Sequence, residues 1–176
     1  MALREVVQFP DTRLKLVSKP ILEINDEIRE LAADMIEVMY DEPGIGLAAP
    51  QVGVSLRLFV IDTDWSDEEV GRNPLVVLNP EISEREGRVS WDEGCLSVPD
   101  YNAVVERDAK LTLRGLDLEG KPIEERAEGL RAVCIQHEVD HLDGILFIDR
   151  ISRLKRGLYA KKRRKQLAEE ADEDRG

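Results

Sequence analysis

Both histidines of this 176-residue chain fall within one pentapeptide, His137-Glu138-Val139-Asp140-His141. In a helix, residues four apart lie on the same face about one turn from each other, so the two imidazoles can bind one metal ion. Glu138 is then the candidate general base for a water molecule that the metal activates. The alternative is a solvated helical turn that carries two polar rings. The metal interpretation requires this segment to be a helix.

A third ligand must come from elsewhere, because a catalytic metal site commonly takes three protein ligands and leaves a position for water. Cys95 is the best candidate, since the preceding Gly94 permits an unusual backbone conformation and a close approach to another element. A free cysteine is otherwise usually a small buried hydrophobic residue. Cys134 is the only other cysteine, so we expect two reduced thiols with separate roles. A disulfide between them is the alternative.

The composition indicates one soluble globular domain. A length of 176 residues suits a single domain. The apolar run at residues 58–61 ends at Asp62, well short of the roughly 18 residues of a membrane span. The first residues lack the apolar stretch of a secretion signal, so we expect a cytoplasmic protein. A net charge of −12 argues against attraction of the whole surface to nucleic acid or anionic lipid, but not against a local basic patch.

Hydrophobic periodicity predicts three helices and three strands. Apolar residues at helical spacing follow Asn25 or Asp26, either of which can cap the helix start, and Pro43-Gly44 stops this helix. These elements indicate a single α+β domain, in which short mixed or antiparallel strands pack around a central metal-binding helix, with a further helix at the C-terminus. The predicted helices cover residues 25–40, 130–141 and about 151 onward, and the predicted strands cover residues 56–62, 75–78 and 110–116.

Three segments together resemble the signature segments of peptide deformylase, in that family's order and at similar separations. They are residues 44–51 (GIGLAAPQ), 93–97 (EGCLS) and 136–141 (QHEVDH). The similarity runs over most of residues 1–150, which we interpret as a deformylase-like catalytic domain. The resemblance implies a metal-dependent hydrolase that removes the formyl group from the N-terminal formylmethionine of newly made polypeptides, so N-formylmethionyl peptides are the expected substrates.

The resemblance also implies roles for individual residues. The metal ligands would be Cys95, His137 and His141, and the ion would be Fe²⁺, with Zn²⁺, Ni²⁺ or Co²⁺ as substitutes. A thiolate and two imidazoles suit all four ions. Besides Glu138, the catalytic residues would be Gln51, through its side-chain amide, and Leu96, through its backbone N–H. An apolar slot for the methionine side chain would be lined by Ile45, Gly46, Leu96, Val133, Cys134 and the ring of His137.

In one place this chain departs from many relatives of that family. They carry a basic residue a few positions past the cysteine segment, whereas this chain has Asp100-Tyr101-Asn102. The contacts that such a residue makes to the substrate backbone are therefore in doubt here.

The glycine segment also satisfies a loose dinucleotide-binding pattern, since residues 44–49 read G-x-G-x-x-A. That pattern requires a preceding strand and a following helix. Here a predicted helix precedes it and Pro50 follows. We therefore expect no dinucleotide cofactor, and we expect the glycines to let the backbone pass close beside the substrate.

The C-terminal segment, residues 151–176, reads as a basic helix followed by an acidic tail. Residues 151–168 contain no acidic side chain and many lysines and arginines, while Leu154 and Leu158 recur at helical spacing and predict a narrow apolar stripe that holds the helix. Transient docking to ribosomal RNA phosphates is one interpretation, and a solvated helix tethered by its leucines is the other. We expect the acidic residues 169–174 to be frayed.

Two other functions fit parts of this pattern. A zinc endopeptidase shares the histidine pentapeptide, although such enzymes usually recruit a further His or Glu ligand and this chain has no third histidine. A ribosome-binding module with a non-catalytic metal site would account for the basic C-terminal segment.

Overall fold

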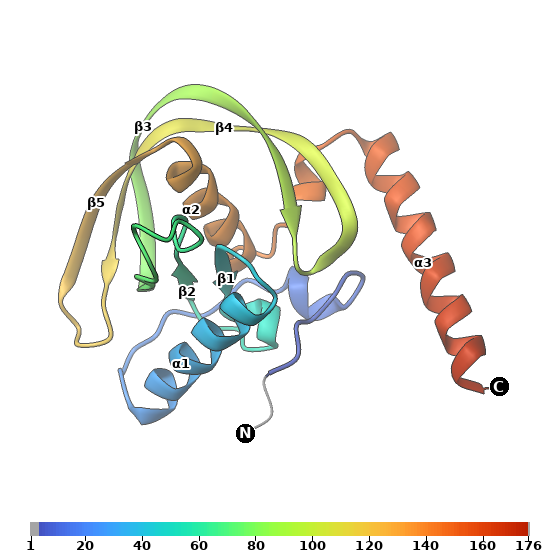
Figure 1. Ribbon diagram of the computed structural model, residues 1–176, viewed down its shortest axis with the longest axis horizontal. Helices are drawn as coiled ribbons and strands as arrows, with labels where there is room; N and C mark the ends of the chain where they lie inside the picture. Colours follow the sequence, from blue (N-terminus) through green and yellow to red (C-terminus); the bar gives the residue numbers. More distant parts are fainter. Residues whose placement is uncertain (1–3, 176) are drawn as a thin grey trace.

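The computed structural model describes residues 4–175 and shows an antiparallel sheet with a helix packed on each face (Figure 1). The sheet order follows the sequence, β1-β2-β3-β4-β5. The strands are β1 (Gly46–Ala48), β2 (Leu58–Ile61), β3 (Leu75–Cys95), β4 (Val98–Leu116) and β5 (Pro122–Glu128). The α-helices are α1 (Asp26–Asp41), α2 (Gly129–Leu142) and α3 (Arg153–Arg175), and 3₁₀ turns cover Thr12–Lys15, Ala49–Val52 and Phe147–Arg150.

Alternation along β2 explains why the sheet carries a helix on each face. Leu58 and Val60 belong to the core cluster that packs against α1, whereas Phe59 and Ile61 belong to the cluster that packs against α2. All four side chains are fully buried. Asn25 caps α1 by accepting a hydrogen bond from the Ile28 backbone N–H at 3.1 Å. The predicted helix 25–40 is confirmed.

Helix α2 occupies the centre of the molecule, under the arch formed by β3 and β4 (Figure 1). Nine of its fourteen residues are buried, because the helix meets the sheet on one side and the segment that follows it on another. A helix in this position has no wide solvent face, which accounts for its continuous apolar start at residues 132–135. The single-domain α+β fold around this helix is confirmed.

Strands β3 and β4 are much longer than predicted. The outer half of β4 packs Tyr101, Ala103 and Val105 on a hydrophobic cluster, and charged pairs such as Arg85 with Asp108 at 2.7 Å and Arg114 with Glu84 at 3.1 Å also join the two strands. A register shift near Glu84, whose φ is 51°, bends the pair of strands. The two strands therefore curve over α2, and their far end carries Cys95 to the helix.

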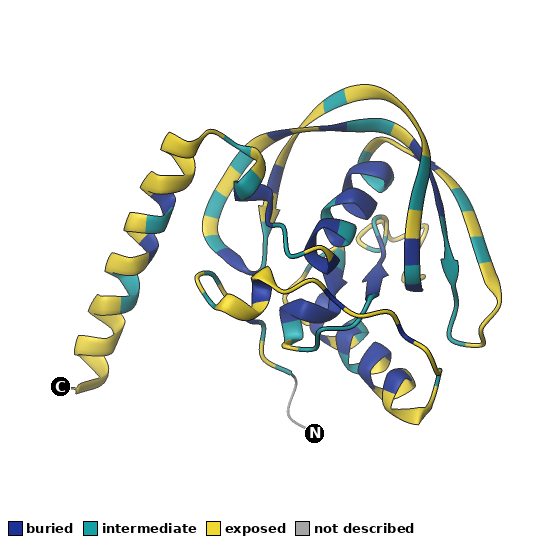
Figure 2. Ribbon diagram, turned by 180° about the vertical axis from the view of Figure 1, so that it is seen from behind, coloured by how far each residue is buried: buried dark blue, intermediate teal, exposed yellow. Residues whose placement is uncertain are grey.

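Helix α3 lies along one side of the molecule and is exposed over most of its length (Figure 2). The predicted apolar stripe is wrong, because Leu154 is 74% exposed and Leu158 is 59% exposed. The helix is held instead by Tyr159, which donates to the Pro99 carbonyl oxygen at 3.1 Å, and by Arg163. The prediction that residues 169–174 are frayed is also wrong, since they continue α3.

Candidate metal centre

Three ligand atoms from two distant parts of the chain converge at the N-terminal end of the β3–β4 turn. Cys95 is the last residue of β3, while His137 and His141 lie one turn apart on α2. The Cys95 Sγ lies 3.4 Å from the His141 Nε2, which lies 3.3 Å from the His137 Nε2. All three ligand atoms lie within 4.8 Å of one another. The structure thus brings together the three residues that the sequence singled out as metal ligands.

The chain reaches this geometry through a local irregularity at Gly94. The register of β3 against β4 shifts between Gly94 and Cys95. A Cβ atom on Gly94 would lie 2.8 Å from the Asn102 Oδ1 of β4, closer than real Cβ contacts. The close approach to another element that the sequence predicted for Gly94 is therefore present, and it turns Cys95 toward α2.

The donor set fits a divalent metal ion. The Nδ1 of His137 lies 2.9 Å from the Glu93 Oε1, so it carries the proton and leaves the Nε2 with a free lone pair directed at the other two ligand atoms. Two imidazole nitrogens and a thiol sulfur in this arrangement suit zinc, iron, nickel or cobalt.

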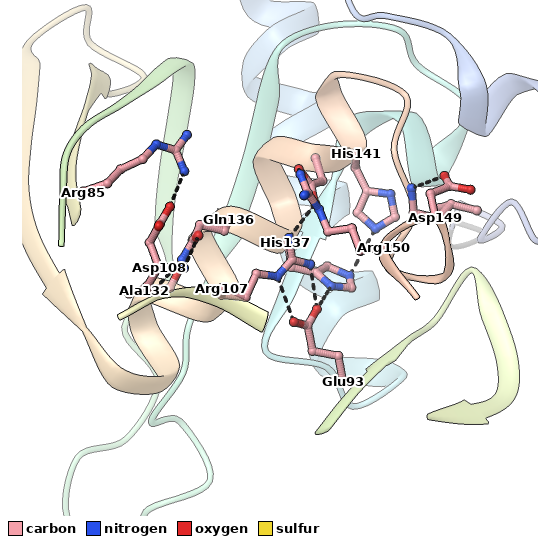
Figure 3. Close-up of polar contacts among 12 residues, drawn as sticks. Arg85, Glu93, Arg107, Asp108, Ala132, Gln136, His137, His141, Asp149 and Arg150 are labelled. Atoms are coloured by element: carbon pink, nitrogen blue, oxygen red, sulfur yellow. Dashed lines mark hydrogen bonds and ion pairs between the residues drawn. The ribbon is translucent and has the colours of Figure 1, made fainter. Parts of the chain in front are cut away.

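A buried ionic network orients His137 (Figure 3). The Arg107 guanidinium donates two hydrogen bonds to the Glu93 carboxylate, both at 2.8 Å, and a third to the Asp140 Oδ2 at 2.6 Å. Arg150 donates to the same Asp140 carboxylate at 2.6 and 2.7 Å. Burial alone would raise the pKa of Glu93, but hydrogen bonds from Arg107 and His137 lower it below its usual value. Glu93 therefore stays ionised and orients the ring of His137.

Sequence reasoning missed this network as a functional feature. The sequence patterns mark Glu93 only as part of a signature segment and predict no role for Arg107, Asp140 or Arg150. Their side chains are charged, and charged residues are mostly exposed, so only tertiary packing shows that Arg107 is 3% exposed. The one available signal was that Glu93 and Asp140 both sit within the signature segments.

Glu138 faces the ligand cluster from α2 and is 3% exposed. Burial raises its pKa to about 7. Its Oε2 atom has no hydrogen-bond partner within residues 4–175. A carboxylate in this setting can exchange a proton near neutral pH, which is the property that general acid–base catalysis needs.

Gln51 reaches the cluster from the Ala49–Val52 turn. Its Oε1 accepts a hydrogen bond from the Ala48 backbone N–H at 3.0 Å, which fixes the orientation of the amide. The Nε2 consequently points toward the site, 3.1 Å from the Ser97 Oγ and 3.5 Å from the Cys95 Sγ. The side chain is therefore a fixed donor beside the ligand atoms.

A cavity of about 370 Å³ opens beside the cluster, a size common for small-molecule sites. One wall comes from residues 43–46 and the opposite wall from α2 and β3. Burial raises the pKa of the Cys134 thiol, and both cysteines are free, as predicted. The lining includes every residue predicted for the methionine slot, namely Ile45, Gly46, Leu96, Val133, Cys134 and His137.

Within residues 100–102, where the chain departs from many relatives, Tyr101 packs against α3. Tyr101 stacks on Tyr159 of α3 with ring centroids 4.9 Å apart, and on Phe147 at 6.2 Å. Phe147 in turn stacks against His137 at 6.2 Å. Tyr101 therefore links α3 to Phe147 and, through Phe147, to His137.

Comparison with known proteins gives a consistent result. A sequence model of the family described as Polypeptide deformylase matches residues 3–157. A peptide deformylase of Alkalilimnicola ehrlichii is 53% identical over 156 residues, which cover 89% of this chain and 86% of the relative. A peptide deformylase of Bradyrhizobium diazoefficiens is 53% identical over 165 residues, which cover 92% of this chain and 95% of the relative.

Solved structures agree over nearly the full length. The peptide deformylase of Legionella pneumophila superposes with a TM-score of 0.88 at 44% identity, covering 97% of this chain and 98% of that one. The peptide deformylase of Ehrlichia chaffeensis in complex with actinonin gives 0.88 at 37% identity, covering 94% and 98%. With the convergent Cys95, His137 and His141, these matches establish that the chain belongs to the peptide deformylase family.

Proposed function

We propose that Cys95, His137 and His141 hold the metal ion with which this enzyme removes the formyl group from the N-terminal methionine of newly made polypeptides. The proposal rests on the convergence of their three ligand atoms beside a cavity that a methionine side chain can enter. A divalent ion there would lower the pKa of water from about 15.7 toward 7 and so supply hydroxide at neutral pH. The remaining tasks fall to residues of the chain.

Glu138 acts as the general base and then as the general acid. It accepts the proton of the attacking water and hands it to the amine nitrogen that leaves the formyl carbon. Its burial supports this role, because the carboxylate is protonated and deprotonated with comparable ease near pH 7. Its position on α2, one residue after His137, keeps it beside the ligand cluster.

Gln51 and Leu96 stabilise the negative oxygen that develops on the formyl carbon. The Gln51 amide is fixed in advance by its hydrogen bond from Ala48, so it needs no reorganisation during the reaction. The backbone N–H of Leu96 follows Cys95 directly and is the second donor. One such donor contributes roughly 3 to 4 kcal/mol in enzymes where it has been removed.

The methionine side chain enters the cavity between residues 43–46 and α2. The slot discriminates among apolar side chains by about 1 to 3 kcal/mol per methylene, so we expect relaxed preference for other apolar first residues.

The zinc endopeptidase and the non-catalytic ribosome-binding module are not favoured, because the family match covers residues 3–157.

The activity is tested with a formylated dipeptide. We expect metal-loaded protein to release a free amine and formate from formyl-Met-Ala, whereas acetyl-Met-Ala, which is larger at the reacting carbon, serves as the comparison. An internal peptide bond in a blocked peptide should stay intact. Cleavage of that peptide without deformylation would instead support the endopeptidase.

We propose that the resident ion is Fe²⁺. A ferrous site with a thiolate ligand should lose activity in air through oxidation of the iron or of Cys95, while zinc-loaded and nickel-loaded samples should last longer. The half-lives of activity in air and under nitrogen give the comparison. Equal decay rates for all three metals would contradict native iron.

We further propose that residues 1–150 form the catalytic unit and that α3 contacts the ribosome transiently. The side chains of Lys161 and Lys162 are exposed on α3, while Arg163, the next residue, is buried and donates to the Phe9 carbonyl oxygen at 3.0 Å. This arrangement leaves cations free for RNA phosphates without loosening the helix.

A cytoplasmic location fits this role, because the newly made substrates emerge from ribosomes in the cytoplasm. In residues 4–175, no helix is both long and apolar enough to span a bilayer.

Charge removal tests the ribosome contact more cleanly than deletion, which would also remove Tyr159. We expect Lys161→Gln/Lys162→Gln to reduce co-sedimentation with ribosomes, most strongly at low salt, with the log–log salt dependence reduced by about one unit per lost phosphate contact. Lys110→Gln/Lys121→Gln, on β4 and the β4–β5 turn, is the matched control. Equal co-sedimentation of both double variants at low salt would contradict docking through α3.

A further inference from the structure

One wall of the substrate cavity is a short piece of backbone, residues 44–46, which we call the wall strip. It passes very close to α2. A Cβ atom on Gly46 would lie 2.7 Å from the Glu138 Oε1 and 3.0 Å from the Cys134 Sγ. A Cβ atom on Gly44 would lie 3.4 Å from the Leu96 Cδ1. The width of the cavity therefore depends on where this strip lies, to within tenths of an ångström.

The wall strip is hydrogen-bonded to the loop that follows β2. The indole Nε1 of Trp65 donates to the Gly44 carbonyl oxygen at 2.9 Å. The backbone N–H of Asp62 donates to the Ile45 carbonyl oxygen at 2.8 Å. Two successive carbonyl groups of the strip are thus tied to one loop, and the Ile45 carbonyl oxygen also accepts from the Cys134 Sγ of α2 at 3.8 Å.

Trp65 is itself fixed by its neighbours. Its ring meets the ring of Tyr40 edge-on, with centroids 5.1 Å apart. The Arg72 guanidinium lies 4.3 Å from the centroid of Tyr40 and 5.4 Å from that of Trp65. The Tyr40 hydroxyl donates to the Asp62 carboxylate at 2.5 Å, and the Asn73 N–H donates to the same Oδ2 at 2.7 Å. Asp62 is 3% exposed, so this anchor is inside the protein.

We infer that Trp65 is a positioning residue for substrate binding, which sets the distance between the wall strip and α2 through its hydrogen bond to Gly44. This inference rests on the proposed function of the cavity. Trp65 is not among the residues that line the cavity, and it contacts none of the metal ligands. Its effect is therefore on the affinity for the peptide, with the reacting groups left in place.

The role is tested with Trp65→Phe, which keeps an aromatic ring beside Tyr40 and Arg72 and removes the Nε1 donor together with part of the indole. We expect KM for formyl-Met-Ala-Ser to rise by about 2- to 12-fold, the equivalent of one net hydrogen bond, with kcat within about 2-fold of the unchanged enzyme. The dissociation constant of unformylated Met-Ala-Ser for the zinc-loaded enzyme should rise by the same factor. Metal content should not change.

Val70→Ala is the matched control, because Val70 is 58% exposed in the same loop. We expect this variant to keep both KM and kcat. A purely structural role for Trp65 would lower the melting temperature and leave KM unchanged, and that result would overturn the inference. A fall in kcat at constant KM would overturn it as well, since it would mean that the reacting groups had moved.

Tyr40→Phe keeps the inference testable if Trp65→Phe does not fold. It removes the hydroxyl that binds Asp62 and retains the ring that supports Trp65. We therefore expect KM to rise by less than it does on loss of the hydrogen bond to the wall strip in Trp65→Phe. An unchanged KM in this folded variant would also count against the inference. Failure of the unmodified enzyme to deformylate the tripeptide would refute the proposed function instead.

Discussion

Replacing Glu138 with alanine is expected to lower kcat by at least about 100-fold, the lower end of what general acid–base catalysis contributes. Bound metal should stay near one ion per chain, because Glu138 is not among the three convergent ligands. We expect kcat to fall because no other carboxylate can replace Glu138, since Glu93 and Asp140 are both held by Arg107. The measurements are kcat for a formylated peptide and metal content by elemental analysis.

Glu138→Gln refines this test, because glutamine keeps the size of the side chain and cannot accept the proton. Since the Oε2 atom is buried without a partner among the described residues, neither variant should destabilise the fold by much. Glu128→Ala, whose side chain is 75% exposed just before α2, is the matched control and should keep full activity. Full activity of Glu138→Gln would refute the assigned role.

Replacing Arg107 with methionine is expected to cost about 3 to 5 kcal/mol in the free energy of unfolding. The substitution preserves most of the side-chain volume and leaves the buried carboxylates of Glu93 and Asp140 without their shared cation. For a chain of this size, the loss corresponds to a fall in melting temperature of roughly 6 to 20 °C. Urea and thermal unfolding of the metal-loaded protein would measure both quantities.

The matched control is Arg114→Met on β4, an arginine of the same sheet whose side chain is 42% exposed. Its ion pairs with Glu84 and Glu124 lie at the surface, where such pairs contribute about 0 to 1 kcal/mol. A loss for Arg107→Met as small as that of the control would mean that the buried network contributes little to folding. The activity of Arg107→Met should fall too. Without Arg107 to keep it ionised, Glu93 no longer holds the tautomer of His137.

The parts of the site that follow a short-range pattern could be predicted from the sequence. A spacing of four residues places His137 and His141 on one face of a helix wherever that helix lies, and periodicity identified both α1 and α2. Cys95 could be chosen because the pair lacked a third ligand and Gly94 marked an irregular backbone. Cys95 lies 42 and 46 residues before the two histidines in the chain. Its closeness to them in space depends on the curvature of β3 and β4, which the sequence pattern does not reveal.

The remainder could not be predicted because it depends on burial of polar groups. Charged residues are frequent in the outer half of β3, where ion pairs such as Arg85 with Asp108 join it to β4. On α3 the leucine spacing suggested a buried face, yet the contact is made by Tyr159 and Arg163 through hydrogen bonds to backbone oxygens. Backbone acceptors leave no trace in a hydrophobic pattern, so the buried face of this helix was assigned wrongly.

The tight passage of Gly46 beside Glu138 also restricts how the enzyme can evolve under selection by inhibitors. A side chain at this position would narrow the cavity and so exclude a bulky inhibitor. The first atom of that side chain, however, would collide with the Glu138 carboxylate, to which we assign the proton transfer. Substitution of Gly46 would therefore weaken catalysis together with inhibitor binding, so variants that resist an inhibitor should arise at other residues that line the cavity.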